Sequence, residues 1–233
     1  MSLSPPSAAV ELERARHRLA LGALALPRFD AGQGARPFVV ALEGPNGAGK
    51  STLRRGLCRA LGAPGCMGAD AAWLGEPLKR RMIGEADWFA SAMFFLSGCF
   101  EQMRRLRRSA APLVIMDRSL WSTLAVQAAE SAERLEALLT MLAPVAGQVR
   151  IPSLTVVLEA SFATCQSRIA HKRAAARALD DLTAGAAFHA REQEFYGWLG
   201  RQVPTLVFLN VDEASPSEVL ERALAVIRER VPC

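Results

Sequence analysis

The stretch Gly44-Pro45-Asn46-Gly47-Ala48-Gly49-Lys50-Ser51 decides the fold of this 233-residue chain. It matches the phosphate-binding pattern G-x-x-x-x-G-K-[ST] at every required position. Residues 38–42 before it are wholly apolar and rich in valine, which is typical of a strand buried on both faces of a parallel sheet. Residues 51–61 after it have a helical pattern. A buried strand, a glycine-rich loop and a helix in this order predict a nucleotide-binding P-loop.

The chemistry of this loop assigns a part to each residue type. Glycines let the backbone N–H groups turn inward around phosphate oxygens, and the helix N-terminus adds a partial positive charge. We expect Lys50 to reach the β- and γ-phosphates and the Ser51 hydroxyl to bind Mg²⁺. The implied cofactors are ATP and Mg²⁺. The predicted ATP-binding residues are Gly44, Asn46, Gly47, Ala48, Gly49, Lys50, Ser51 and Thr52.

Short apolar runs alternate with helical patterns along the rest of the chain. Further strands are predicted at residues 113–116, 154–158 and 205–209, and further helices at 81–108, 120–141, 161–200 (interrupted near 179–185) and 217–230. This alternation predicts an α/β fold, a three-layer α/β/α sandwich with a parallel sheet of about five strands.

The domain organisation follows from a change in composition near residue 36. Residues 1–36 are predicted to form a helical extension and linker, with a helix from about residue 7 to 26 that Pro27 ends. Residues 30–34 have the glycine-rich composition of a linker. Residues 37–233 then form the P-loop domain.

The bulk composition excludes several classes of protein. Lysines and arginines number 28 and the net charge is +5, but the densest basic stretch, residues 104–108, is one cluster and reads as a solvated helix end. We therefore expect no nucleic-acid partner. No apolar run approaches the ~18 residues that a membrane span requires. The five cysteines are scattered without metal-ligand spacing, so we expect free thiols in a reducing cytoplasm.

A second informative segment, Asp117-Arg118-Ser119, follows the second predicted strand. An acidic residue at the carboxyl end of such a strand lies near the phosphate loop in this fold class, where Asp117 can hold Mg²⁺ directly or through water. Arg118 can bridge the donor γ-phosphate and an acceptor phosphate. The alternative reading is a surface Asp–Arg pair that opens a helix.

With these motifs the chain resembles thymidylate kinases over roughly residues 38–231. The shared features are the phosphate loop, Asp117-Arg118, the run Ser122-Thr123-Leu124-Ala125-x-Gln127, and Gly75-Glu76-Pro77. The resemblance implies a kinase fold with a helical lid, transfer of phosphoryl from ATP to dTMP to give dTDP, a small-molecule nucleotide substrate and a homodimer.

Further site residues are expected around the acceptor. Arg173 and Arg177, four residues apart in a basic stretch, fall where the family has its lid and would share one helix face. Phe94 and Phe95 can stack on a base, and the Gln127 amide can pair with its edge, although two phenylalanines on a helix are equally typical of a core. Glu76 is expected near the sugar or a metal-bound water.

The chain departs from the thymidylate kinase pattern on the acceptor side. Gly75 stands where the family has arginine, Ser119 and Val126 replace tyrosines, and Cys99 lies where we expect an arginine. These departures bear on the identity of the acceptor more than on phosphoryl transfer.

Two alternatives remain open. Deoxynucleoside kinases share a Glu-Pro pair and a Glu-Arg-Ser motif, and in that interpretation Glu76 is the base for a nucleoside 5′-hydroxyl. A monophosphate acceptor needs arginines rather than a base, and the run that ends at Gln127 favours it. More distantly, the chain is a nucleotide-binding regulatory protein whose N-terminal helix docks a partner, although a switch needs no acceptor site.

Overall fold

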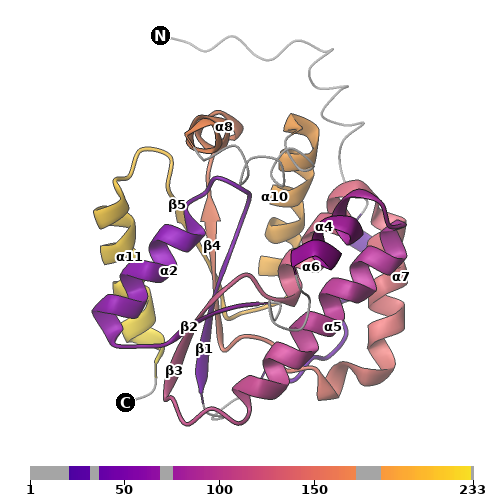
Figure 1. Ribbon diagram of the computed structural model, residues 1–233, viewed down its shortest axis with the longest axis horizontal. Helices are drawn as coiled ribbons and strands as arrows, with labels where there is room; N and C mark the ends of the chain where they lie inside the picture. Colours follow the sequence, from indigo (N-terminus) through magenta and orange to yellow (C-terminus); the bar gives the residue numbers. More distant parts are fainter. Residues whose placement is uncertain (1–20, 32–36, 69–75, 172–184, 232–233) are drawn as a thin grey trace.

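A single parallel sheet of five strands organises the structure, a computed structural model that describes residues 21–31, 37–68, 76–171 and 185–231. The strand order is β2-β3-β1-β4-β5, with helices on both faces (Figure 1). The strands are β1 (Phe38–Glu43), β2 (Gly65–Met67), β3 (Leu113–Asp117), β4 (Leu154–Glu159) and β5 (Leu206–Asn210). The predicted three-layer α/β/α fold is confirmed, and with it four strands near their expected positions.

Burial of the central strand β1 on both faces explains why residues 38–42 are wholly apolar. Val40 and Leu42 point to one face, into a core shared with α2 (Lys50–Leu61) and α11 (Pro216–Arg230). Val39 and Ala41 point to the other face, against α5 (Trp88–Leu106). Successive side chains alternate between faces, so residues 38–42 of a strand covered on both sides are all apolar, and the charged residue Glu43 comes only at its carboxyl end.

The helices of the second face form the larger core. They are α5, α6 (Leu120–Glu130), α7 (Ala132–Leu142) and α10 (Ala186–Gly200), with the short α4 (Glu76–Gly84) and the 3-10 segment η2 (Ala143–Gln148) beside them (Figure 1). Trp121 of α6 is fully buried in this core. The phosphate loop leads from β1 to α2 on one face, whereas α6 and α7 connect β3 to β4 on the other. Ligands of open α/β sheets bind at such a change of direction, outside the carboxyl ends of the strands.

Two long predicted helices are each divided by a capping residue. The helix expected at 120–141 breaks at Ser131, whose backbone is extended and whose hydroxyl accepts a bond from the Arg134 amide. The pattern expected at 81–108 is α4 and α5, and the Asp87 carboxylate caps α5. Side-chain acceptors of this kind satisfy the first amides of a helix and fix where it begins.

The described part of the N-terminal segment differs from the helix expected up to residue 26. It forms a 3-10 turn at Leu21–Ala23, and residues 24–29 are irregular. Leu21 is buried in the core of the second face, and Phe29 packs edge-on against Trp121, with ring centroids 5.6 Å apart. Asp30 forms an isolated parallel bridge with Arg150. Residues 21–31 therefore pack on the P-loop domain.

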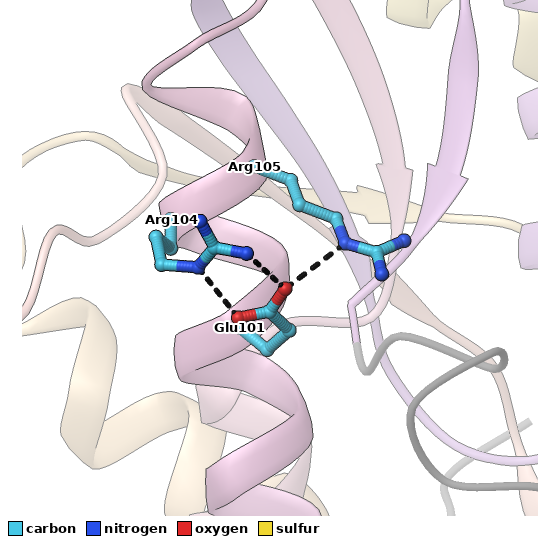
Figure 2. Close-up of polar contacts among 3 residues, drawn as sticks. All are labelled: Glu101, Arg104 and Arg105. Atoms are coloured by element: carbon cyan, nitrogen blue, oxygen red, sulfur yellow. Dashed lines mark hydrogen bonds and ion pairs between the residues drawn. The ribbon is translucent and has the colours of Figure 1, made fainter.

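Two arginines of the basic cluster at the end of α5 are paired with a glutamate of the same helix (Figure 2). Both guanidinium groups of Arg104 and Arg105 bind the Glu101 carboxylate, at 2.6 and 3.1 Å. The hydrogen bond from Arg104 is the main cause that lowers the pKa of Glu101 to about 2. This agrees with the prediction of a solvated helix end. Among the described residues, none of the helices combines the length and apolar character that crossing a membrane requires, and Cys58, Cys66, Cys99 and Cys165 are free.

Candidate functional site

The phosphate loop lies at the carboxyl edge of the sheet, between β1 and α2. Gly44, Gly47 and Gly49 have φ angles of 116°, 89° and 103°, a backbone conformation that side chains disfavour. A Cβ on Gly44 would also overlap the Leu158 carbonyl, and one on Gly47 would lie 2.5 Å from the Cys165 carbonyl oxygen. The loop is therefore packed tightly against β4 and against α8 (Phe162–Ala170), and its glycines are structurally required.

Lys50 is folded back onto its own loop. Its ammonium donates hydrogen bonds to the carbonyls of Gly44 and Pro45, at 2.6 and 2.7 Å, and only 6% of the residue is exposed. Burial, followed by repulsion from the Arg118 guanidinium, lowers the pKa of Lys50 to about 7. A phosphate group that entered the loop would offer this ammonium a better acceptor than two carbonyls.

Ser51 and Asp117 bring two oxygen ligands together from different elements. Ser51 is the second residue of α2, and its hydroxyl donates to Asp117 Oδ2 at 2.7 Å; Asp117 is the last residue of β3 and is almost fully buried. Across the described ranges, no group of three or more His, Cys, Asp or Glu side chains is arranged to hold a metal. Mg²⁺ bound with nucleotides typically takes one or two protein oxygens and completes its shell with phosphates and water. The pair therefore fits Mg²⁺.

Arg118 is held in a strained conformation at the edge of the loop. It is the only non-glycine residue in the described part of the chain with a positive φ, 69°, and its amide donates to the Leu42 carbonyl at 2.9 Å. Its guanidinium donates to the Ser122 hydroxyl at 3.3 Å and to Asn46 Oδ1 in the loop. A Cβ on Gly68 would overlap the Arg118 carbonyl. Strain of this kind is concentrated at functional sites.

Sequence reasoning missed a buried carboxylate directly before the loop. Glu43 ends β1 with no exposed surface and accepts hydrogen bonds from Ser119 (2.6 Å), Ser122 and Tyr196 (3.0 Å). Burial raises the pKa of Glu43, opposed by its hydrogen bonds and the Arg118 charge. The available signal was a charged residue at the end of an otherwise apolar strand.

A second missed carboxylate, Glu192, lies on α10. It is 5% exposed, and burial raises its pKa while the charges of Arg118 and Lys50 oppose that shift. Glu192 and Tyr196 are four residues apart and therefore share one face of α10. This face is turned toward the phosphate loop.

The residues predicted to contact a base lie on α5 and α6. Gln127 is buried on α6, and its Oε1 atom finds no hydrogen-bond partner among the described residues. Phe94 and Phe95 are half-buried on α5 and pack edge to face, with ring centroids 5.3 Å apart. A buried amide oxygen without a donor is uncommon, and a ligand N–H group would satisfy it.

The remaining predicted residues lie on α2, α4 and α8 or outside the described residues. Arg173 and Arg177 lie outside the described residues. Glu76 is the first residue of α4, and its side chain is not described. Thr52 is exposed in the first turn of α2 and accepts a weak bond from Arg55 at 3.4 Å. Arg168, in the last turn of α8, donates to the Ala48 and Val211 carbonyls at 3.2 and 2.8 Å, so it braces the loop.

Comparison with known proteins gives a family and a fold. The family model described as an AAA domain matches residues 39–194, from β1 into α10. A sequence comparison with curated proteins gave no match.

Two kinds of solved kinase structure are similar to this chain. One is the thymidylate kinase from Candida albicans, with a TM-score of 0.64 at 17% identity over 83% of this chain and 92% of that one. The other is the deoxyadenosine kinase from M. mycoides with bound dATP, with a TM-score of 0.63 at 16% identity over 82% of this chain and 99% of that one. At these identities the likeness establishes a shared fold.

Proposed function

The chain belongs to the AAA domain family, and we propose that it is a kinase that transfers the γ-phosphoryl group of ATP to a pyrimidine nucleoside monophosphate, with dTMP as the first candidate. The observation that carries this proposal is the position of Arg118. Its guanidinium reaches Asn46 in the phosphate loop from the residue that directly follows the metal-binding candidate Asp117.

The donor half of the reaction rests on the loop. Its backbone amides and Lys50 would bind the triphosphate, and the two carbonyls that now accept from the Lys50 ammonium would be replaced by phosphate oxygens. Ser51 and Asp117 would hold Mg²⁺, which, when bound, neutralises charge on the phosphates. Phosphoryl transfer requires little covalent chemistry from the protein, so positioning and charge stabilisation are its main tasks.

The acceptor half rests on Arg118 and Gln127. Two phosphate groups repel each other, and a guanidinium that can bind both reduces this repulsion as the groups approach. A P-loop that only bound a nucleotide would not require an arginine between two phosphate groups, and in a P-loop that hydrolysed one the arginine would contact the γ-phosphate alone. The unpartnered Gln127 oxygen on α6 is suited to accept a bond from the N–H group of a pyrimidine base. Arg173 and Arg177 would add charge from the lid, and Glu76 would act near the sugar or a metal-bound water.

The similarity to thymidylate kinase and deoxyadenosine kinase structures is consistent with this class of acceptor. It does not separate a monophosphate from a nucleoside, because the two TM-scores, 0.64 and 0.63, are nearly equal. The choice of a monophosphate depends on Arg118 and on the Ser122–Gln127 run.

The test is ADP formation from MgATP in the presence of each member of a panel of nucleosides and nucleoside monophosphates. We expect acceptor-dependent ADP with dTMP or another pyrimidine monophosphate, and its loss in Lys50→Met. Activity with thymidine but not with dTMP would select a nucleoside kinase instead, with Glu76 as the base. Absence of acceptor-dependent ADP across the panel would refute the kinase and favour a nucleotide-binding regulatory protein.

A further inference from the structure

The geometry points to Glu43 as a positioning residue that, together with Tyr196, fixes the Ser122 hydroxyl which holds Arg118 beside the phosphate loop. This inference rests on the proposed function, because it assigns the network to the arginine that would contact the transferred phosphate. None of the three supporting residues needs to touch substrate.

The Ser122 hydroxyl links Glu43 to Arg118 through two hydrogen bonds of defined direction. A serine hydroxyl has one proton and two acceptor lone pairs. Ser122 donates its proton to Glu43 Oε2, and its lone pairs are then free to accept from Arg118 Nη1, at 3.3 Å. If Glu43 lost its negative charge, the Ser122 proton could turn toward the guanidinium, and the contact would become repulsive.

Two further hydroxyl groups hold the Glu43 carboxylate in place. Ser119 donates to Oε1 at 2.6 Å and Tyr196 to Oε2 at 3.0 Å. The Ser119 hydroxyl also accepts from the Trp121 amide at 3.2 Å, so the start of α6 is tied to the same carboxylate. Three O–H donors on one carboxylate favour its ionised form and compensate in part for its burial.

Exclusion of water makes this arrangement rigid. Glu43 has no exposed surface, Tyr196 is 1% exposed and Ser122 is 7% exposed. Bonds to a charged group in such a site are about twice as strong as neutral ones, and the buried side chains have little contact with solvent that could replace a lost partner. The charged groups that act on this network are Arg118, Lys50 and Glu192, and Asp117 acts on Lys50 in turn.

The network connects three separate elements to the loop. Glu43 comes from β1, Ser122 from α6 and Tyr196 from α10, 153 residues after Glu43. Arg118 itself continues the network to Asn46. Because a misplacement of about 1 Å at a reacting group can cost about a hundredfold in rate, the packing of α10 against α6 would set the efficiency of Arg118.

The first experiment compares Tyr196→Phe with the wild type in steady-state kinetics. The matched control is Thr155→Val, which removes a buried hydroxyl that has no hydrogen-bond partner among the described residues. In Tyr196→Phe we expect kcat to fall about tenfold, the effect of one lost bond to a charged group, with the KM for ATP within about twofold. Glu43→Gln should lose more, about a hundredfold, and Thr155→Val should match the wild type.

The second experiment observes Arg118 without relying on the reaction. The protein is labelled with ¹⁵N-arginine, and the NMR signal of the Arg118 guanidinium is assigned by its absence in Arg118→Lys. This signal should report slow rotation of the guanidinium in the wild type and faster rotation in Tyr196→Phe and Glu43→Gln. The positioning role is refuted if Tyr196→Phe folds and changes neither the Arg118 rotation nor kcat. A wild type that phosphorylates no acceptor refutes the proposed function instead, and the Arg118 rotation still decides whether the network orients this arginine.

Discussion

Raising the pH from 7 to 8.5 should stabilise the nucleotide-free protein through Lys50. The folded-state pKa of this ammonium is about 7, against 10.5 for an ordinary lysine. Between these two values the unfolded chain binds one proton more than the folded chain, so stability rises with pH by up to about 1.4 kcal/mol per pH unit. At pH 7 Lys50 is half protonated in the folded state, and integration up to pH 8.5 gives a gain of about 1–2 kcal/mol.

The assay is urea denaturation of the wild type and of Lys50→Met at both pH values. Methionine keeps much of the apolar stem but has no titrating group, so the gain attributed to Lys50 should be absent from the variant. Glu43 and Glu192, whose pKa values burial raises, contribute a slope of opposite sign as long as they hold protons. Both proteins contain them, but the Lys50 charge lowers the pKa of Glu192, so the difference between the two proteins reports Lys50 together with its interaction with Glu192. The buried thiols of Cys66 and Cys165 have pKa values of about 11, against 9.0 for an ordinary thiol, so they begin to lower stability as the pH approaches 9.0; both proteins contain them.

ATP affinity should respond in the opposite direction over the same interval. Phosphate oxygens require the ammonium form of Lys50, and the free protein loses that form as the pH rises through 7. Binding of ATP should therefore weaken by up to about tenfold per pH unit above 7 in calorimetric titrations without catalysis. Equal pH slopes of stability in the wild type and Lys50→Met, or an ATP affinity that does not change between pH 7 and 8.5, would refute the assignment of a depressed pKa to Lys50.

Three further predictions concern stability. Gly68→Ala should lower the free energy of unfolding by about 1–3 kcal/mol in urea denaturation and reduce turnover, because the added Cβ would overlap the Arg118 carbonyl. Gly197→Ala is the matched control inside α10, where an added Cβ meets no atom within 4 Å. It should raise the free energy of unfolding by about 0.5–1 kcal/mol. Equal effects of the two substitutions would contradict this. Thr155→Val should leave stability unchanged or increase it, since its buried hydroxyl has no partner among the described residues, and a loss above about 1 kcal/mol would reveal a missing bond. Glu101→Gln should lower the melting temperature at low salt but not at high salt, because its ion pairs lie on the surface of α5.

The parts of the fold that were predictable are those fixed by local chemistry. The wholly apolar run at residues 38–42 predicts a buried strand, because both faces of β1 are covered by helices. The two helix breaks were missed for a related reason: the apolar periodicity continues across Ser131, and only the hydroxyl cap marks the boundary. The edge strand β2 has three residues, two of them exposed, too few for an alternating pattern to be visible.

The candidate site was predictable only as far as its motifs are contiguous. The phosphate loop and Asp117-Arg118 can be read from a few neighbouring residues. The bonds to Glu43 cannot, because its partners Ser119, Ser122 and Tyr196 follow it by 76 to 153 positions. Tyr196 lies on α10, and no motif in the sequence of this helix indicates a function. Contacts over such separations depend on how elements pack, and one sequence does not contain that information.

The conformation of Arg118 explains how one dipeptide can serve both ends of the phosphate loop. Asp117 ends β3 and accepts from Ser51 at the helix end of the loop, whereas Arg118 reaches Asn46 at the strand end. A positive φ at a non-glycine residue costs about 1–3 kcal/mol, and the extended strand would otherwise continue past the loop. The bonds to Leu42 and Ser122 and the close approach of Gly68 hold this turn. Ser119, which stands where the thymidylate kinase pattern has tyrosine, meets the same requirement, because its hydroxyl caps α6 and donates to Glu43. The departure from the thymidylate kinase pattern at position 119 therefore falls on a residue that supports Arg118 through Glu43 and Ser122.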